Sequence, residues 1–356
     1  MDIPGLDVMS RTLADLDKAE MGVEGYTLAD LDKAIKKEPT KIYYSFKDYE
    51  YNDKGKERIT SGLKQLDYLL SGFELGCITM WTGVTNSGKT TMLTKLTKET
   101  IEQGEKVFYF NGEQTKDDFK NNIYKQSVPK EAIVKKRYKD TNIYDYYIND
   151  YYLQTMKTRY DDNLFIYNNE VKRDIGTLLY AMEEVRQKHG VRVFVLDNLM
   201  QIDITSDNIY QEQSNIMEKL RTFAVNKQVH IHLVAHPRKV ADFQVRLTLY
   251  DVAGSMNLAN KAYNIISIIR TSNIVKDSQE YRLLQSDLLN ENYVLDDSDG
   301  ILEVLKTKGN RCGLVAMKYD PLTKTYQMLP QISPEVAESL KVNKPTFKGG
   351  KNKCPF

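Results

Sequence analysis

The sequence predicts an α/β fold with a mostly parallel central sheet flanked by helices, plus a short helical N-terminal arm. Between Lys41 and about Met328, apolar runs of strand length alternate with helical segments, which is typical of such a sheet. Within this region, residues 83–90 (GVTNSGKT) form a glycine-rich loop of a kind that connects a strand to a helix. A length of 356 residues suits one large domain with terminal appendages.

Three parts follow along the chain. Residues 1–40 form the predicted arm, in which the segment TLADLDKA at Thr12–Ala19 recurs at Thr27–Ala34. Each copy has a narrow leucine stripe that cannot build a core alone, so the arm either packs on its own domain, stays mobile, or docks on a neighbouring subunit. Residues 41–335 form the α/β domain. Residues 336–356 are predicted to be a disordered basic tail, with five lysines and no acid from Lys341 onward.

The elements of the α/β domain are predicted from apolar runs. The first strand is Cys77–Thr82, and the helix after the glycine-rich loop is Thr90–Gln103. Further strands of one large sheet are expected at Val107–Asn111, Asn163–Asn168, Val191–Leu196, His230–Ala235, Tyr263–Ile269, Ile301–Lys306 and Leu314–Tyr319.

Two stretches interrupt this pattern. Asn273–Gly300 is expected to be a long polar insertion between two strands. Tyr138–Tyr160 is dense in tyrosine, and we expect its rings to cover the core while their hydroxyls stay in water. The alternative is that these rings stack on nucleobases.

Charge and cysteine content narrow the class of protein. Fifty basic and 49 acidic residues give a net charge of +1, so any basic binding site must be local. Three widely spaced cysteines fit neither a disulfide framework nor a zinc site, which favours a reducing cytoplasm. No apolar run reaches the roughly 18 residues of a membrane span, and no signal peptide pattern opens the chain, so no membrane contact is expected.

The glycine-rich loop is a complete phosphate-binding (Walker A) motif. It matches G-x-x-x-x-G-K-[ST], in which backbone N–H groups surround the phosphates, the lysine reaches the outer ones and the hydroxyl binds Mg²⁺. ATP or another NTP and Mg²⁺ are therefore the predicted cofactors. The predicted nucleotide-binding residues are Gly83, Val84, Thr85, Asn86, Ser87, Gly88, Lys89, Thr90 and Thr91.

Two acids complete the predicted hydrolysis site. Asp197 ends the apolar run that starts at Val191, where a carboxylate joins Thr90 at the metal. The following Asn198 either positions water or caps the strand. Glu113 follows the strand Val107–Asn111 and is the candidate general base, the alternative being a surface glutamate at a helix start.

Several motifs resemble those of a known superfamily. Ser61-Gly62, Leu66-Asp67, Gly72 and Leu75-Gly76 resemble the segment that precedes the P-loop in RecA-like P-loop NTPases. The strings HLVAHPRK at 232–239 and DVAGS at 251–255 resemble motifs of hexameric replicative helicases of the DnaB-like group, closest to the Twinkle and phage-type branch. The resemblance spans Arg58 to Met328.

The resemblance implies a role for each matching residue. Lys89 and Thr90 would hold phosphate and Mg²⁺, Glu113 would activate water, Asp197 would complete the metal site, and His236 would sense the γ-phosphate. A mobile loop after His236 would grip the backbone of single-stranded DNA in a central channel. Its DNA-binding residues would be Arg238, Lys239 and Arg246.

The chain departs from the family pattern at the finger that reaches a neighbour's nucleotide. Family members carry a lysine and an arginine two residues apart, whereas here Lys306 is followed by Lys308, and Arg311 comes three residues later. Either Lys308 or Arg311 is therefore the predicted trans finger. A lysine lacks the planar fork of arginine, so the exchange affects the rate.

The resemblance implies an ATP-dependent replicative DNA helicase that assembles as a ring, taken as a hexamer, and unwinds forked duplex while moving on single-stranded DNA. Primase, polymerase or a loader are the implied partners. The 57 residues before the lead-in are too few for a primase domain, so primer synthesis is not expected. The expected compartment is the cytoplasm, or the host cytosol for a phage protein. Two alternatives remain: a recombination or repair ATPase that forms filaments on DNA, and a nucleotide-switched loader or scaffold without unwinding activity.

Overall fold

The computed structural model describes residues 45–48, 55–137, 139, 142, 144–204, 208–238, 244–252, 256–308 and 311–342. The chain divides into two compact units, Met1–Gly55 and Lys56–Phe356, and the description below concerns the second. The predicted arm at residues 1–40 lies outside the described residues. So does the tail from residue 343 onward, while helix α11 (Pro334–Val342) crosses the boundary predicted at residue 335.

The strands are β1 (Arg58–Ile59), β2 (Phe73–Glu74), β3 (Ile78–Thr82), β4 (Val107–Asn111), β5 (Ile133–Arg137), β6 (Tyr144–Ile148), β7 (Leu164–Ile166), β8 (Val193–Asp197), β9 (His230–Val234), β10 (Asn264–Arg270), β11 (Gly300–Lys306), β12 (Leu314–Asp320) and β13 (Thr325–Met328). The other helices are α3 (Lys64–Leu70), α4 (Lys89–Glu102), α5 (Lys116–Ser127), α6 (Asp150–Tyr160), α7 (Ile175–His189), α8 (Ile209–Lys227), α9 (Met256–Lys261) and α10 (Gln279–Asn290).

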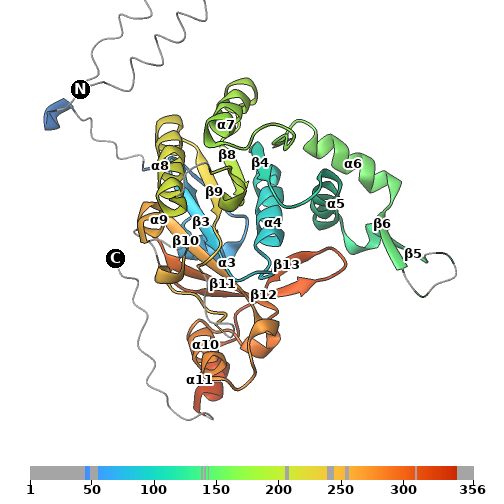
Figure 1. Cartoon of the computed structure of the whole chain (residues 1–356). Helices are drawn as coiled ribbons and strands as arrows, with labels where there is room; N and C mark the ends of the chain where they lie inside the picture. The colour runs from blue at the N-terminus through green and yellow to red at the C-terminus, as the bar shows by residue number, and fades with distance from the viewer. Residues whose placement is uncertain are drawn as a thin grey trace, which may run out of the picture. The chain divides into compact units, whose positions relative to one another are not determined.

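One mixed sheet of nine strands forms the centre of the unit, in the order β13-β12-β11-β10-β3-β9-β8-β4-β7 (Figure 1). The strands from β10 to β7 pair in parallel, and β11 to β13 add antiparallel pairs at one side. The prediction of a mostly parallel sheet is confirmed. Each predicted strand overlaps an observed one, whereas the short strands β1 and β2, the pair β5–β6, and β13 were not predicted.

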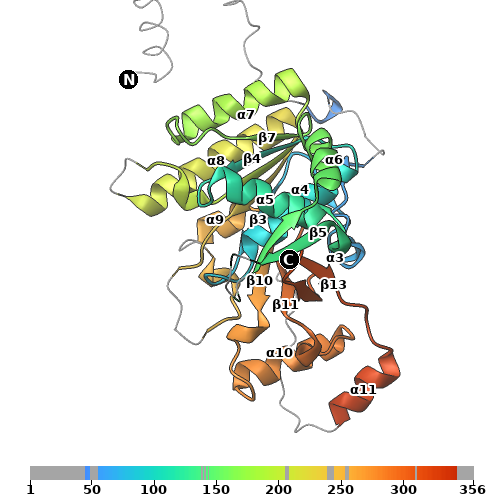
Figure 2. The same ribbon diagram turned by 90° about the vertical axis from the view of Figure 1, so that its right-hand side faces the viewer.

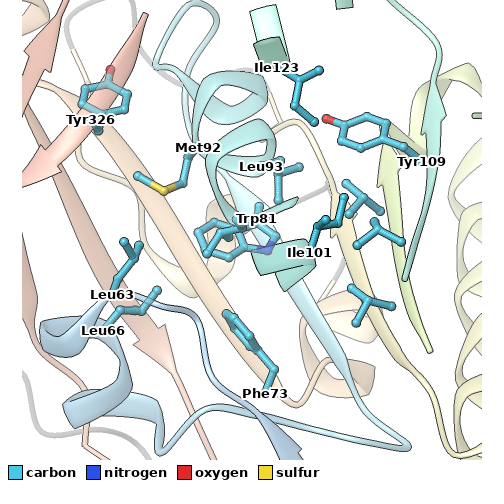
Figure 3. Close-up of a cluster of buried hydrophobic side chains, with 14 of the residues drawn as sticks. Leu63, Leu66, Phe73, Trp81, Met92, Leu93, Ile101, Tyr109, Ile123 and Tyr326 are labelled. Carbon is cyan, nitrogen blue, oxygen red and sulfur yellow. The ribbon is translucent and has the colours of Figure 1, made fainter. Parts of the chain in front are cut away.

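The parallel strands bury both faces, and for this reason they are apolar throughout. Trp81 and Tyr109 point into a core under α4 and α5, which Figure 3 shows. Their strand neighbours Met80 and Phe108 point into a second core, which α7, α8 and α9 cover. The central strands are thus held on both sides, which fixes the positions of the loops at their ends.

Helix α10 lies within the segment predicted as a polar insertion, and that part of the prediction is wrong. Leu284 and Leu288 are fully buried and lie four residues apart, so they share one face of the helix. That face packs with Ile269 and Ile301 of the sheet in a third core. The polar residues between the leucines hid a helical period that was present in the sequence.

The tyrosine-rich segment forms the two-stranded ribbon β5–β6 and helix α6. Tyr160 is buried in the core, as expected. The expectation is wrong for Tyr144, Tyr146, Tyr147 and Tyr151, whose side chains are exposed.

Two further findings concern cysteine and membranes. Cys77 is a free thiol and Cys312 is disulfide-bonded, which the cysteine spacing did not predict. Within the described ranges, no helix has the length and apolar character needed to cross a bilayer.

Candidate active site

The glycine-rich loop connects the buried strand β3 to the start of α4, as the sequence predicts. Gly83 has a φ of 147°, and a Cβ there would lie 2.5 Å from the carbonyl oxygen of Ile268. Gly88 has a φ of 96°, and a Cβ there would lie 2.6 Å from the hydroxyl of Tyr326. Only glycine fits these two positions, so the loop backbone stays open toward the N-terminus of the helix.

Lys89 is held inside this loop. Its buried ammonium donates hydrogen bonds to the carbonyl oxygens of Gly83 at 2.9 Å and Val84 at 3.0 Å. Burial lowers the pKa of Lys89, while the charges of Asp197 and Glu113 oppose that shift. A cation at a helix N-terminus, with loop amides around it, fits the phosphates of a nucleotide.

Thr90 and Asp197 meet at the other side of the helix start. The Thr90 hydroxyl donates a hydrogen bond of 2.7 Å to Oδ2 of Asp197, and the Tyr109 hydroxyl donates to the same oxygen at 3.3 Å. Burial raises the pKa of Asp197 to about 6. A hydroxyl and a carboxylate are hard oxygen donors, which fit Mg²⁺. In the described part of the chain no three His, Cys, Asp or Glu side chains cluster as a metal site, so phosphate oxygens and water would supply the other ligands.

Glu113, Asn198 and His236 come together beyond the ends of three adjacent strands, β4, β8 and β9. The Asn198 amide donates to Oε1 of Glu113 and lies 3.0 Å from Nε2 of His236. The same His236 nitrogen lies 3.5 Å from Oε1 of Glu113. Burial and the charge of Lys89 lower the pKa of His236. A carboxylate and a neutral imidazole are therefore linked through one amide.

Asn198 does more than the sequence suggested. Its Oδ1 accepts a hydrogen bond of 2.9 Å from the backbone N–H of Met200, so the side chain caps the short helix that follows β8. Capping was one of its two predicted roles. The amide bridge between Glu113 and His236 was not predicted, because it joins residues that are 85 and 38 positions away.

Aromatic side chains next to the loop were also missed. Tyr326 lies against Gly88, and the ring of Tyr319 lies 5.2 Å from the ring of Tyr326. The positive charge of Arg270, at the end of β10, acts on both tyrosines. Figure 3 places Tyr326 beside the start of α4. Rings and a guanidinium beside a phosphate loop can bind a nucleobase by stacking.

The two finger candidates lie at the opposite edge of the sheet. Lys306 pairs with Ile265 near the start of β10, and Asn264 pairs with Thr79 near the start of β3, whereas the phosphate loop follows the end of β3. A strand of this length separates the two edges by about 16 Å. Neither Lys308 nor Arg311 can therefore contact the nucleotide of its own subunit.

The two candidates differ in their contacts. Arg311 forms an ion pair of 2.9 Å with Glu291 and lies over the ring of Tyr68. Lys308 is exposed, and its ammonium lies 5.9 Å from the ring centroid of Tyr263. Lys308 is thus the candidate that keeps its cation available to a neighbour.

The predicted DNA-binding residues have different surroundings. Arg238 is exposed and lies 3.4 Å from Asp251. Lys239 lies outside the described residues. Arg246 is largely buried and forms ion pairs of 2.7 Å with Glu303 and 2.6 Å with Asp287, and both acids raise its pKa against the effect of burial. This pairing ties Arg246 to the fold and removes it from the residues available to bind phosphate.

Comparisons with known proteins agree with this arrangement. The family model described as the DnaB-like helicase C-terminal domain matches residues 58–326. A solved DnaB-like replicative helicase, studied with its interactions with primase, aligns with a TM-score of 0.61 and 15% identity over 92% of this chain and 73% of that one. A solved ATPase domain gives 0.60 and 15% over 86% and 100%. A KaiC-like protein from Pyrococcus horikoshii gives 0.51 and 14% over 78% and 100%. These structural matches establish the RecA-like P-loop NTPase fold.

Proposed function

Since this chain belongs to the DnaB-like helicase C-terminal domain family, we propose that it is an ATP-dependent replicative DNA helicase motor. In this proposal it assembles as a hexameric ring and moves on single-stranded DNA to unwind a forked duplex. The observation that carries the proposal is the linked set Glu113–Asn198–His236, which joins the candidate general base to the strand end that leads into the basic segment. Placement in the Twinkle and phage-type branch is part of the proposal.

The roles of the residues follow from their positions. Lys89 binds the outer phosphates, and Glu113 takes a proton from the attacking water. Mg²⁺, when bound, neutralises charge on the phosphate oxygens, and Thr90 and Asp197 would hold it. Asn198 orients the Glu113 carboxylate. Tyr319 and Arg270 are placed to stack on the base of the nucleotide.

His236 is the proposed sensor. Its ring contacts the Asn198 amide, so a change at Glu113 on loss of the γ-phosphate alters the hydrogen bonds of His236. The chain after His236 is tied down at once, because the Arg238 N–H donates to the carbonyl oxygen of Asp251 at 2.9 Å. A small movement at His236 therefore reaches Arg238, which we propose to contact a DNA phosphate together with Lys239.

The proposed trans finger is Lys308. It lies at the sheet edge opposite the phosphate loop, and Arg311 is already paired with Glu291. An active site in this proposal combines Lys89 of one subunit with Lys308 of the next, which requires head-to-tail contacts of the kind that close a ring. Primase, a polymerase or a loader are the proposed partners, and the cytoplasm, or the host cytosol for a phage protein, is the proposed compartment.

An unwinding assay on a forked duplex tests the function. The intact protein should separate the strands only with ATP and Mg²⁺, and Lys89→Ala should lose both hydrolysis and unwinding. ATP hydrolysis without unwinding, by protein that has assembled on single-stranded DNA, would contradict the helicase proposal and favour a scaffold or loader. Electron microscopy of the same sample distinguishes closed rings from the filaments of a recombination ATPase.

A further inference from the structure

The ribbon β5–β6 takes no part in the proposed ATP site. It extends from the region of α5 and α6 at the right of Figure 1, and it points toward the viewer in Figure 2, so both views place it away from the central sheet. Its base is fixed, because Ile133 is buried and Ile148 packs against the same core. Beyond this base the side chains of both strands are largely exposed.

The register of the ribbon assigns each side chain to a face. Lys135 pairs with Tyr146, and Arg137 pairs with Tyr144, so these four side chains share one face, here called the aromatic face. The Lys135 ammonium lies 3.8 Å from the ring centroid of Tyr144, which agrees with this assignment.

The aromatic face combines two exposed rings with two cations and has no acid among its paired residues. Tyr144 and Tyr146 are each 41% exposed, and they lie two residues apart on one strand, a spacing of about 7 Å. The carboxylate of the ribbon, Asp145, belongs to the opposite face, where it accepts a hydrogen bond of 3.1 Å from Tyr147.

We propose that the aromatic face binds single-stranded nucleic acid, outside the loop that follows His236. Tyr144 and Tyr146 stack on two successive unpaired bases, while Lys135 and Arg137 pair with the phosphates beside them. The cations flanking the rings favour a polyanion over an apolar protein surface. A duplex does not offer its base faces, so the site selects an unpaired strand.

Two sets of variants of the full chain test the proposal, each with a control on the opposite face. The first set compares the double variant Tyr144→Thr and Tyr146→Thr with Tyr147→Thr, which removes a ring that is more exposed, at 53%. The second compares the double variant Lys135→Gln and Arg137→Gln with Lys136→Gln. Threonine suits a strand, so the ribbon is expected to persist in the first set.

The measurements are the Kd of a fluorescent oligothymidylate without nucleotide, its dependence on salt, and photo-crosslinking of an iodouracil-substituted strand followed by peptide mapping. The tyrosine pair variant should weaken binding at least about tenfold, against less than about twofold for Tyr147→Thr. The Lys135 and Arg137 double variant should lower the salt slope by about 1.4. Crosslinks should map to Tyr144 or Tyr146.

Three results would overturn the proposal: an unchanged Kd with no crosslinks in β6, an equal loss of binding to a blunt duplex, or a change in sedimentation with unchanged DNA binding. The last result would identify the aromatic face as a protein contact. The proposed motor function is checked separately in the same variants, because DNA-stimulated ATP hydrolysis depends on Arg238 and should persist in all of them.

Discussion

The position of Lys308 leads to a quantitative prediction about subunit mixing. Lys308 and the phosphate loop lie at opposite edges of the sheet, about 16 Å apart, so a lysine side chain cannot span the distance within one subunit. If the finger acts on a neighbour, Lys308→Ala alone should lose about 10² to 10³ in the rate of ATP hydrolysis, the usual cost of one lost cationic donor at a transition state. Lys89→Ala alone should also be inactive.

Mixing these two inactive proteins should restore hydrolysis. A complete site needs Lys89 from one subunit and Lys308 from the next, and in a random one-to-one mixture each is present with a probability of one half. The product predicts about one quarter of the wild-type rate in a head-to-tail ring. A finger acting within its own subunit predicts no complete site in the mixture.

The assay is steady-state ATP hydrolysis with single-stranded DNA, on co-assembled protein whose size is checked by light scattering. Arg311→Ala is the matched control, and it should hydrolyse ATP by itself because the Arg311 guanidinium pairs with Glu291 in its own subunit. A mixture that assembles fully but stays at background would refute the assignment of Lys308. Complementation of Lys89→Ala by an inactive Arg311→Ala would transfer the role to Arg311.

Three further predictions concern the site and the core. Glu113→Gln should bind nucleotide normally but lose at least about 100-fold in turnover, measured by equilibrium binding and single-turnover hydrolysis; a normal rate would remove Glu113 as the base. Arg238→Ala should keep basal hydrolysis and lose DNA stimulation without a change in Tm, whereas Arg246→Ala leaves Glu303 buried and unpaired and should cost about 3 kcal/mol of stability in urea unfolding. Burial lowers the pKa of His230 to about 4 from an ordinary value of 6.5, so stability present above pH 6.5 is lost as the pH falls toward 4, by about 3 kcal/mol; unfolding at pH 7 and pH 5, with NMR of the imidazole, should find His230 neutral in the folded protein at both.

Features with a local signal in the sequence were predictable. The phosphate loop, Asp197, Glu113 and His236 each follow an apolar strand closely, and parallel strands bring their carboxyl ends to one edge. The sheet was predictable for the same reason, since its strands are buried on both faces. The structure places these residues together, while their catalytic roles stay predictions.

Features that depend on distant partners were not predictable. The ion pair of Arg246 joins it to Glu303, 57 positions away, and nothing near Arg246 distinguishes it from a free cation of a basic loop. Asn198 has the same difficulty, because the amide bridges residues of two other strands. The exposed tyrosines of β5–β6 failed for another reason: an isolated ribbon has no second layer to cover it, and tyrosine content alone does not reveal whether a strand joins the main sheet.

The contacts of Arg246 give the basic segment an anchor at each end. At one end, Arg238 follows His236, which contacts Asn198 in the nucleotide site of its own subunit. At the other end, Arg246 is bound to Glu303 in the middle of β11, the strand that leads directly to Lys308. If Lys308 acts on the neighbour's nucleotide, the segment between the two arginines is attached to one active site through β9 and to the next through β11. Because both strands belong to one closely packed sheet, hydrolysis at either site can change the tension on the same DNA-binding segment, and the loss of stability in Arg246→Ala should then be accompanied by weaker coupling between neighbouring sites.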